Sequence, residues 1–284
     1  MIIRAIGFFS ALVGAAIAAN SAERPQICAV AAVFGPLEKG ALNAADECIK
    51  VAVNPKDKAP ALHLRARALL WTGSRDWQAM IDAATAALKA NPKDDWPRLV
   101  RGQAHLRSGN VDLALADLNL AIKSKRVRDI EGPNARLEWA AAQIAKNNWK
   151  KAEAEAFALW KEMESDPRVS GIAYVTAQRA GDKAKVSELT SHVLAWPVNA
   201  YGGHYISMFL GRLTPDEALM RALDSGAEFT SASLCTTHFL AGEYYMIGGH
   251  TAEAKKHFDA AIATGTVAYP EFAIAQVEVR KFQP

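Results

Sequence analysis

Two pairs of side chains that could take part in chemistry lie in the last third of the chain. Cys235 and His238 are three residues apart, within reach of each other on one helix, as a nucleophile and its base would need to be. His250 and His257 are seven residues apart, so one helical face could present both imidazoles to a metal ion. The first pair would serve hydrolysis, and the second would serve metal binding.

Each pair also has an interpretation without chemistry. Cysteine and histidine at this spacing are common by chance, and Cys235 is then a small core residue. No third ligand stands at suitable spacing from the two histidines, so we favour solvated surface residues there and predict no metal or cofactor. His204 and Tyr205 could line a pocket or form a loop.

Motifs that carry a known mechanism are missing from the chain. It has no HExxH, no Walker-type glycine loop, no GxSxG and no CxxC. We therefore predict a protein that is not an enzyme. The alternative is a hydrolase or small-ligand site within residues 196–238, built from His204 or from Cys235 with His238.

The composition is that of a folded protein. Half of the 284 residues are hydrophobic, which is enough apolar material for a sizeable core. The formal net charge of +3 gives no ground for a nucleic-acid partner, which would require a dense basic stripe.

The N-terminal residues have the pattern of a secretory signal. Arg4 precedes an apolar run over residues 5–19, and small residues at 16–18 and 20–22 offer cleavage sites. We predict a signal peptide over residues 1–22, a mature chain with no membrane span, and a periplasmic or secreted location. A buried first helix and an uncleaved anchor are the alternatives. The residues before Cys28 lack the small side chains of a lipoprotein signal.

Export makes a disulfide worth considering, because an exported protein meets an oxidising compartment. Cys28 and Cys48 are equidistant from Glu38, which lies within the turn-like stretch 35–40. Two antiparallel helices joined by that turn would bring the two cysteines to the same level. We predict a Cys28–Cys48 disulfide, and two separate buried thiols are the alternative.

A repeat with a period of about 34 residues runs along the chain. Three columns of mostly small residues keep one register, with successive spacings of 34, 38 and 102 residues, the last being three periods. The first column holds Ala68, Gly102, Ala140 and Gly242. The second holds Met80, Ala114, Ala152 and Ala254, and the third holds Ala87, Ala121, Leu159 and Ala261.

Each repeat divides into two helical segments around a turn. Gly109 breaks one hairpin, and Thr214-Pro215-Asp216-Glu217 is a capping box with proline at the first helical position. One spacing is 38 residues instead of 34. The four extra residues fall in the polar segment 123–129, which we predict to be a loop. No stretch alternates with period two for long enough to require a strand. The fold class predicted is all-α.

A helix–turn–helix unit of 34 residues with these small positions resembles the tetratricopeptide repeat. The residues that carry the resemblance are Gly102, Gly109, Ala114, Leu118 and Ala121, with Gly242, Tyr245, Ala254, Phe258 and Ala261, and with Ala68, Trp71, Trp77, Ala87 and Pro92. The best repeats span 61–94, 95–128, 133–165 and 235–268, and degenerate hairpins span 24–55, 167–195 and 199–226. The family implies a single α-solenoid over residues 23–284, here with a capping helix after residue 269.

The C-terminal third is also similar to tetratricopeptide proteins of bacterial envelopes, including lipoproteins that act as protease adaptors. Its residues are Trp196-Pro197, Phe209 to Pro215, Leu234-Cys235 and Glu271-Phe272-Ala273. In the repeats between, Tyr174 and Met208 occupy positions where the family has glycine or alanine.

The resemblance implies a concave groove lined by the first helix of each hairpin. The faces turned away from the packing positions give Arg65, Leu69, Trp96, Leu99, Gln103, Arg168 and Glu243 as groove residues. Trp96 precedes Pro97 and could instead serve to fix the start of its helix. We expect an exported scaffold or adaptor that binds an unidentified protein or peptide segment. A module that stacks end to end is a third possibility, opposed by the capping helix.

Overall fold

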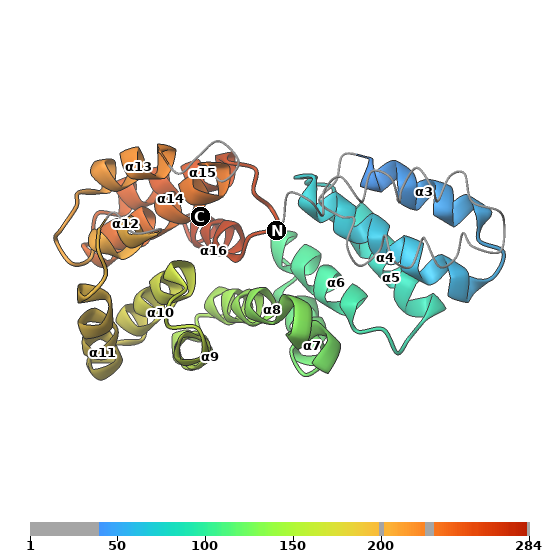
Figure 1. Cartoon of the computed structure of the whole chain (residues 1–284), viewed down its shortest axis with the longest axis horizontal. Helices are drawn as coiled ribbons and strands as arrows, with labels where there is room; N and C mark the ends of the chain where they lie inside the picture. Colours follow the sequence, from blue (N-terminus) through green and yellow to red (C-terminus); the bar gives the residue numbers. More distant parts are fainter. Residues whose placement is uncertain (1–39, 199–201, 225–229, 283–284) are drawn as a thin grey trace. The chain divides into compact units, whose positions relative to one another are not determined.

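The computed structural model describes residues 40–198, 202–224 and 230–282, and these are helical with no strand among them (Figure 1). The predicted all-α fold class is confirmed. The predicted signal peptide, residues 24–39 and Cys28 lie outside the described residues. Clustering of the chain gives two compact units, one ending at Ile130 and the other beginning at Glu131.

The first unit consists of helices that pack one after another along the chain. Capping side chains and prolines determine where they begin. The side chain of Asn54 accepts a hydrogen bond from the Asp57 amide, and that of Asp76 accepts one from the Ala79 amide. The helices are α3 (Ala41–Val51), α4 (Pro55–Trp71), α5 (Trp77–Ala90), α6 (Trp96–Arg107) and α7 (Val111–Ala121), and α8 (Lys125–Ala145) crosses the boundary between the units.

The second unit continues the same sequential packing. Its further helices are α9 (Trp149–Glu162), α10 (Pro167–Ala180), α11 (Lys183–Leu194), α12 (Gly203–Ser207), α13 (Pro215–Leu223), α14 (Thr230–Ile247), α15 (Thr251–Ala263) and α16 (Pro270–Arg280). Contacts also join alternate helices. Helix α12 packs against α10 and α14, and α14 packs against α16. In the first unit α4 packs against α6 in the same way. These alternate helices are the first members of successive hairpins.

The small residues of the repeat register lie where neighbouring helices approach most closely. All twelve positions in the three columns are buried. A methyl group on Gly102 would lie 2.8 Å from Leu118 Cγ, and one on Gly242 would lie 2.5 Å from Phe258 Cε1. The two glycines occupy the same position of their repeats, and so do Leu118 and Phe258. Helices α6 and α7, and helices α14 and α15, therefore pack through the same pair of positions.

The polar segment 123–129 differs from the sequence prediction. We expected a loop, but α8 begins at Lys125 and includes the rest of this segment. Lysine and arginine are good helix formers, and Lys125 pairs with Asp129 one turn later, at 2.6 Å. The extra residues of this repeat therefore lengthen a helix instead of a loop.

A membrane-spanning helix was not expected in the mature chain. Within 40–198, 202–224 and 230–282, no helix combines the length and the apolar character that a bilayer crossing requires.

Candidate functional site

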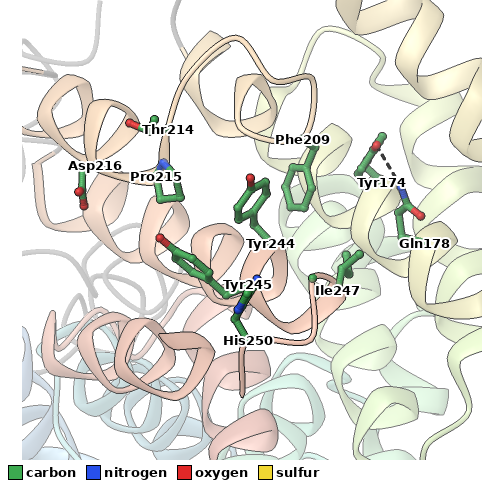
Figure 2. A pocket seen from close by; sticks show the side chains of 11 residues that line it. Tyr174, Gln178, Phe209, Thr214, Pro215, Asp216, Tyr244, Tyr245, Ile247 and His250 are labelled. Carbon is green, nitrogen blue, oxygen red and sulfur yellow. Dashed lines mark hydrogen bonds between the residues drawn. The ribbon is translucent and has the colours of Figure 1, made fainter. Parts of the chain in front are cut away.

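The second unit contains a cleft of about 560 Å³ with aromatic walls. It lies where α10, the segment after α12, the start of α13 and the end of α14 come together (Figure 2). Its volume lies within the range of ligand-binding sites. The residues that line it are Tyr174, Gln178, Phe209, Thr214, Pro215, Asp216, Tyr244, Tyr245, Ile247, Gly248 and His250.

The aromatic rings of the cleft form a continuous series. Tyr174 and Phe209 have ring centroids 5.0 Å apart, Phe209 and Tyr244 are 5.8 Å apart, and Tyr244 and Tyr245 are 5.5 Å apart. The planes of the last pair meet at 82°, so the two rings are nearly perpendicular (Figure 2). Tyr244 is 37% exposed and Ile247 is 39% exposed, which leaves part of the cleft wall in contact with solvent.

Helices α10 and α14 position this series through one close contact. A methyl group on Gly171 would lie 2.9 Å from Leu240 Cδ1, so the two helices approach closely there. Tyr174 follows Gly171 by about one helical turn, and Tyr244 follows Leu240 by about one turn. Their bulk fills the space beyond the contact and forms the side wall of the cleft.

The bulky residue at position 174 is therefore part of the site. Tyr174 stands where the repeat has a small residue, and nothing in the sequence alone connects this departure with a site. In the structure Tyr174 is buried, lies against Phe209, and accepts a hydrogen bond from Gln178 Nε2 through its hydroxyl oxygen at 3.1 Å. A large residue at a packing position was the signal that could have drawn attention to this region.

The opposite edge of the cleft is set by the start of α13, where the predicted capping box is confirmed. The Thr214 hydroxyl accepts a hydrogen bond from the Glu217 amide at 3.2 Å, and the Glu217 carboxylate accepts one from the Thr214 amide at 2.7 Å. This fixes Pro215 and Asp216 in the first helical turn. In the described part of the chain, no hydrogen bond or ion pair involves the Asp216 carboxylate, which lies exposed at the cleft.

Asp216 gives the cleft a negative local field. Burial raises the pKa of the Tyr245 phenol, and Asp216, Tyr244 and Glu253 add to that rise, with the two carboxylates disfavouring the phenolate. The lining includes no lysine or arginine. The charges at the cleft therefore favour a positively charged ligand.

A pair of histidines supports Tyr245 from behind. The His257 ring stacks on Tyr245 with centroids 5.3 Å apart, and His257 Nδ1 lies 3.1 Å from His238 Nδ1. Burial lowers the pKa of His238 to about 4, with His257 adding to the effect, and burial also lowers the pKa of His257. Both rings are thus neutral at pH 7, and one donates a hydrogen bond to the other.

Contacts between partly buried arginines and buried carboxyl groups hold the helices around the cleft together. Arg168 on α10 forms a two-bond contact with Glu271 on α16, at 2.7 and 2.9 Å. Arg179 on α10 bonds to Glu243 on α14 at 2.7 Å, and its guanidinium lies 4.1 Å from the centre of the Trp149 ring. The cleft is therefore formed on helices that are linked by charged contacts.

The seven residues predicted to line a groove have varied surroundings. Leu69, Trp96, Leu99, Gln103 and Glu243 are buried. Arg65 is partly exposed and pairs with Asp46 at 2.8 Å, and Arg168 pairs with Glu271 as described. Protein binding by this set stays a prediction, and Arg65 is the member with the most accessible side chain for a partner. None of the seven lines the aromatic cleft.

Trp96 lies in a cationic environment within the first unit. The guanidinium carbons of Arg67 and Arg126 lie 4.7 and 5.0 Å from the centre of its ring, and His63 meets it edge-on at 5.0 Å. The alternative interpretation, that Trp96 serves to fix the start of its helix, agrees with its position as the first residue of α6.

Of the candidate catalytic residues, Cys235 and His204 are buried, and His238 is partly buried. Cys235 is fully buried, and burial raises the pKa of its thiol to about 12. His238 contacts His257. Burial lowers the pKa of His204 to about 4, and its ring lies against Tyr205.

His250 and His257, considered above as an alternative metal pair, have different surroundings. His250 is the N-cap residue of α15, whereas His257 faces His238. The described residues include no group of three or more His, Cys, Asp or Glu side chains that could hold a metal ion. Cys48 is buried on α3, and its predicted disulfide partner Cys28 lies outside the described residues.

No protein-family model matches this chain, and no curated protein matches it. The geometry of the site therefore carries the functional argument.

Proposed function

We propose that this chain is a helical-repeat protein that binds a peptide segment of another protein in the aromatic cleft. The observation that carries the proposal is the series of four aromatic rings that lines a partly open cleft between first helices of successive hairpins. Tyrosine and other aromatic residues supply much of the binding energy at protein interfaces. Exposed aromatic surface on a framework of packed helices is suited to holding an extended segment.

The repeat register supports membership of the tetratricopeptide class. Its small residues are buried, and Gly102 with Leu118, and Gly242 with Phe258, form equivalent close contacts in two hairpins. Stacked hairpins of this kind build extended binding surfaces instead of enclosed catalytic centres. We infer a scaffold or adaptor, and the N-terminal signal pattern supports its export to a bacterial periplasm or envelope.

The residues considered for catalysis support a function without chemistry. A nucleophilic cysteine needs a lowered pKa and access to substrate, and Cys235 has neither. We therefore place binding ahead of hydrolysis. Binding of a small molecule is the second candidate, and the volume of the cleft is the observation that favours it.

A peptide selection tests the proposed function. The full chain is immobilised, a randomised peptide library displayed on phage is selected against it, and the affinity of each recovered peptide is measured by fluorescence anisotropy. We expect Tyr244→Ala to weaken binding about tenfold or more, as loss of a central aromatic contact does. Leu223→Ala is the matched control, because Leu223 is also an exposed apolar residue (58%) but does not line the cleft.

Two results would separate the candidates. Peptides that bind wild type and both variants equally would show that the cleft is not a peptide site. Small-molecule binding would then be tested by thermal-shift screening of wild type against Tyr244→Ala. A compound that stabilises wild type alone would support the second candidate.

A further inference from the structure

We propose that the aromatic cleft receives a positively charged group, the guanidinium or ammonium of an arginine or lysine in the bound peptide, in the corner formed by the rings of Tyr244 and Tyr245, in the cleft that Asp216 also lines. This inference rests on the proposed peptide-binding function and names the chemistry that the peptide must carry. Three features of the cleft support it: the ring geometry, the local charge, and the contrast with aromatic rings elsewhere in the chain.

The ring geometry provides two walls of a cation site. A cation is attracted to the face of an aromatic ring, so a strong site surrounds it with several rings at large mutual angles. The planes of Tyr244 and Tyr245 meet at 82° with centroids 5.5 Å apart, and those of Phe209 and Tyr244 meet at 66° with centroids 5.8 Å apart. Figure 2 shows these three rings in succession on one side of the cleft, with Pro215 and Asp216 beyond Tyr245.

The local charge is complementary to a cation. Asp216 is exposed at the cleft, and no contact within the described chain neutralises its carboxylate. Asp216 and Tyr245 both line the cleft. The lining residues include no lysine or arginine that would repel the cation of a bound peptide.

Other aromatic rings of this chain already have cations of their own. Arg179 and Lys281 lie over Trp149, Lys161 lies over Trp160, and Arg168 lies over Tyr269. Among the described residues, no lysine or arginine lies over Tyr244, Tyr245 or Phe209. Apart from the face of Tyr245 that stacks on His257, these three rings, beside a carboxylate without an ion pair, are thus available for a cation supplied by a partner.

A comparison of two small probes tests the charge directly. Arginine amide and citrulline amide have nearly the same shape, but the guanidinium of the first is replaced by a neutral urea in the second. Each is titrated into the full chain with labelled isoleucine methyl groups, and the Ile247 methyl, which lies at the cleft, reports binding by NMR. We expect arginine amide to bind at least about threefold more tightly, the lower end of a cation–π contact.

Variants assign the preference to its residues. Asp216→Asn should reduce the ratio of the two affinities toward one, and Tyr245→Leu should reduce it while leaving Asp216 in place. Asp259→Asn is the matched control, because Asp259 is an exposed carboxylate that pairs with Lys255 outside the cleft. It should leave the ratio unchanged. Equal affinities for both probes in wild type, or a ratio unaffected by Asp216→Asn, would overturn the inference.

The peptide selection keeps this inference distinct from the proposed function. Enrichment of arginine or lysine among peptides whose binding depends on Tyr244 would support both. Selected peptides that depend on Tyr244 but are centred on proline or leucine would overturn the cation inference and leave peptide binding intact. If no peptide depends on Tyr244, peptide binding in the cleft fails, and so does a peptide cation as its ligand.

Discussion

Replacement of Gly242 by alanine should destabilise the protein, although alanine is the better helix former. Gly242 lies in α14 against Phe258 of α15, and an added methyl group would lie 2.5 Å from Phe258 Cε1 and 2.6 Å from Cδ1. Real contacts of this kind are much longer, so one of the two helices or the ring must shift. Phe258 is fully buried beside Phe239, with ring centroids 6.5 Å apart, so its ring has no open space to enter.

Two opposing effects set the magnitude. Alanine in place of glycine within a helix contributes about 1 kcal/mol of stability, and overpacking of a well-filled core costs about 1–3 kcal/mol. We therefore expect the unfolding free energy to fall by up to about 2 kcal/mol. Phe258→Ala removes every ring atom near the new methyl group, so in that background Gly242→Ala should be neutral or stabilising by up to about 1 kcal/mol.

A double-mutant cycle measures this reversal. Wild type, Gly242→Ala, Phe258→Ala and the double variant are unfolded in denaturant and followed by circular dichroism. Phe258→Ala by itself should cost about 3–5 kcal/mol. We expect a coupling energy of about 1–3 kcal/mol between the two sites, the overpacking cost that is relieved. An equal stabilisation by Gly242→Ala in both backgrounds would refute the close packing of α14 and α15 at this position.

Three further outcomes are expected. Glu271→Gln should lower the unfolding free energy by about 3–5 kcal/mol because it leaves Arg168 without its charged partner, whereas Arg168→Met with Glu271→Leu should cost much less in the same denaturant assay. Burial and the neighbouring Glu278 raise the pKa of Glu243 from 4.5 to about 8, so between these pH values the folded state keeps a proton that the unfolded chain has lost. The unfolding free energy should therefore decline as the pH rises from 4.5 to 8. Glu243→Gln should flatten that decline in melting experiments. Wild type and Cys235→Ala should label equally with a thiol reagent in native buffer and differ in denaturant, since the Cys235 thiol is buried with a pKa of about 12.

The sequence was sufficient for the helices and for their closest contacts. Capping residues and prolines are local signals, so the start of α13 could be read from Thr214 and Pro215. The repeat register predicted small buried residues because glycine and alanine are what a close helix crossing requires. The local signals failed at Lys125, where a charged segment without an apolar pattern continues as helix.

The cleft could not be read in the same way. Tyr174, Phe209, Asp216 and Tyr244 come from four separate segments, and no spacing rule connects them. The burial of Glu243 was equally inaccessible, because it depends on which helices pack over it. A side chain's local sequence determines its helix and its face, but the neighbours of that face come from distant segments.

By itself, the sequence determined the secondary structure, the repeat period and the residues at the helix crossings, since each of these depends on interactions within one hairpin. Tertiary structure decided which aromatic side chains meet, and it buried Cys235 and His204 while leaving Tyr244 exposed at the cleft. The physical reason is that burial and pKa are properties of the whole packed environment. Glycine at 171 brings α10 and α14 together, tyrosine at 174 and 244 forms the side wall beyond that contact, and only the packed helices turn these separate choices into a cleft.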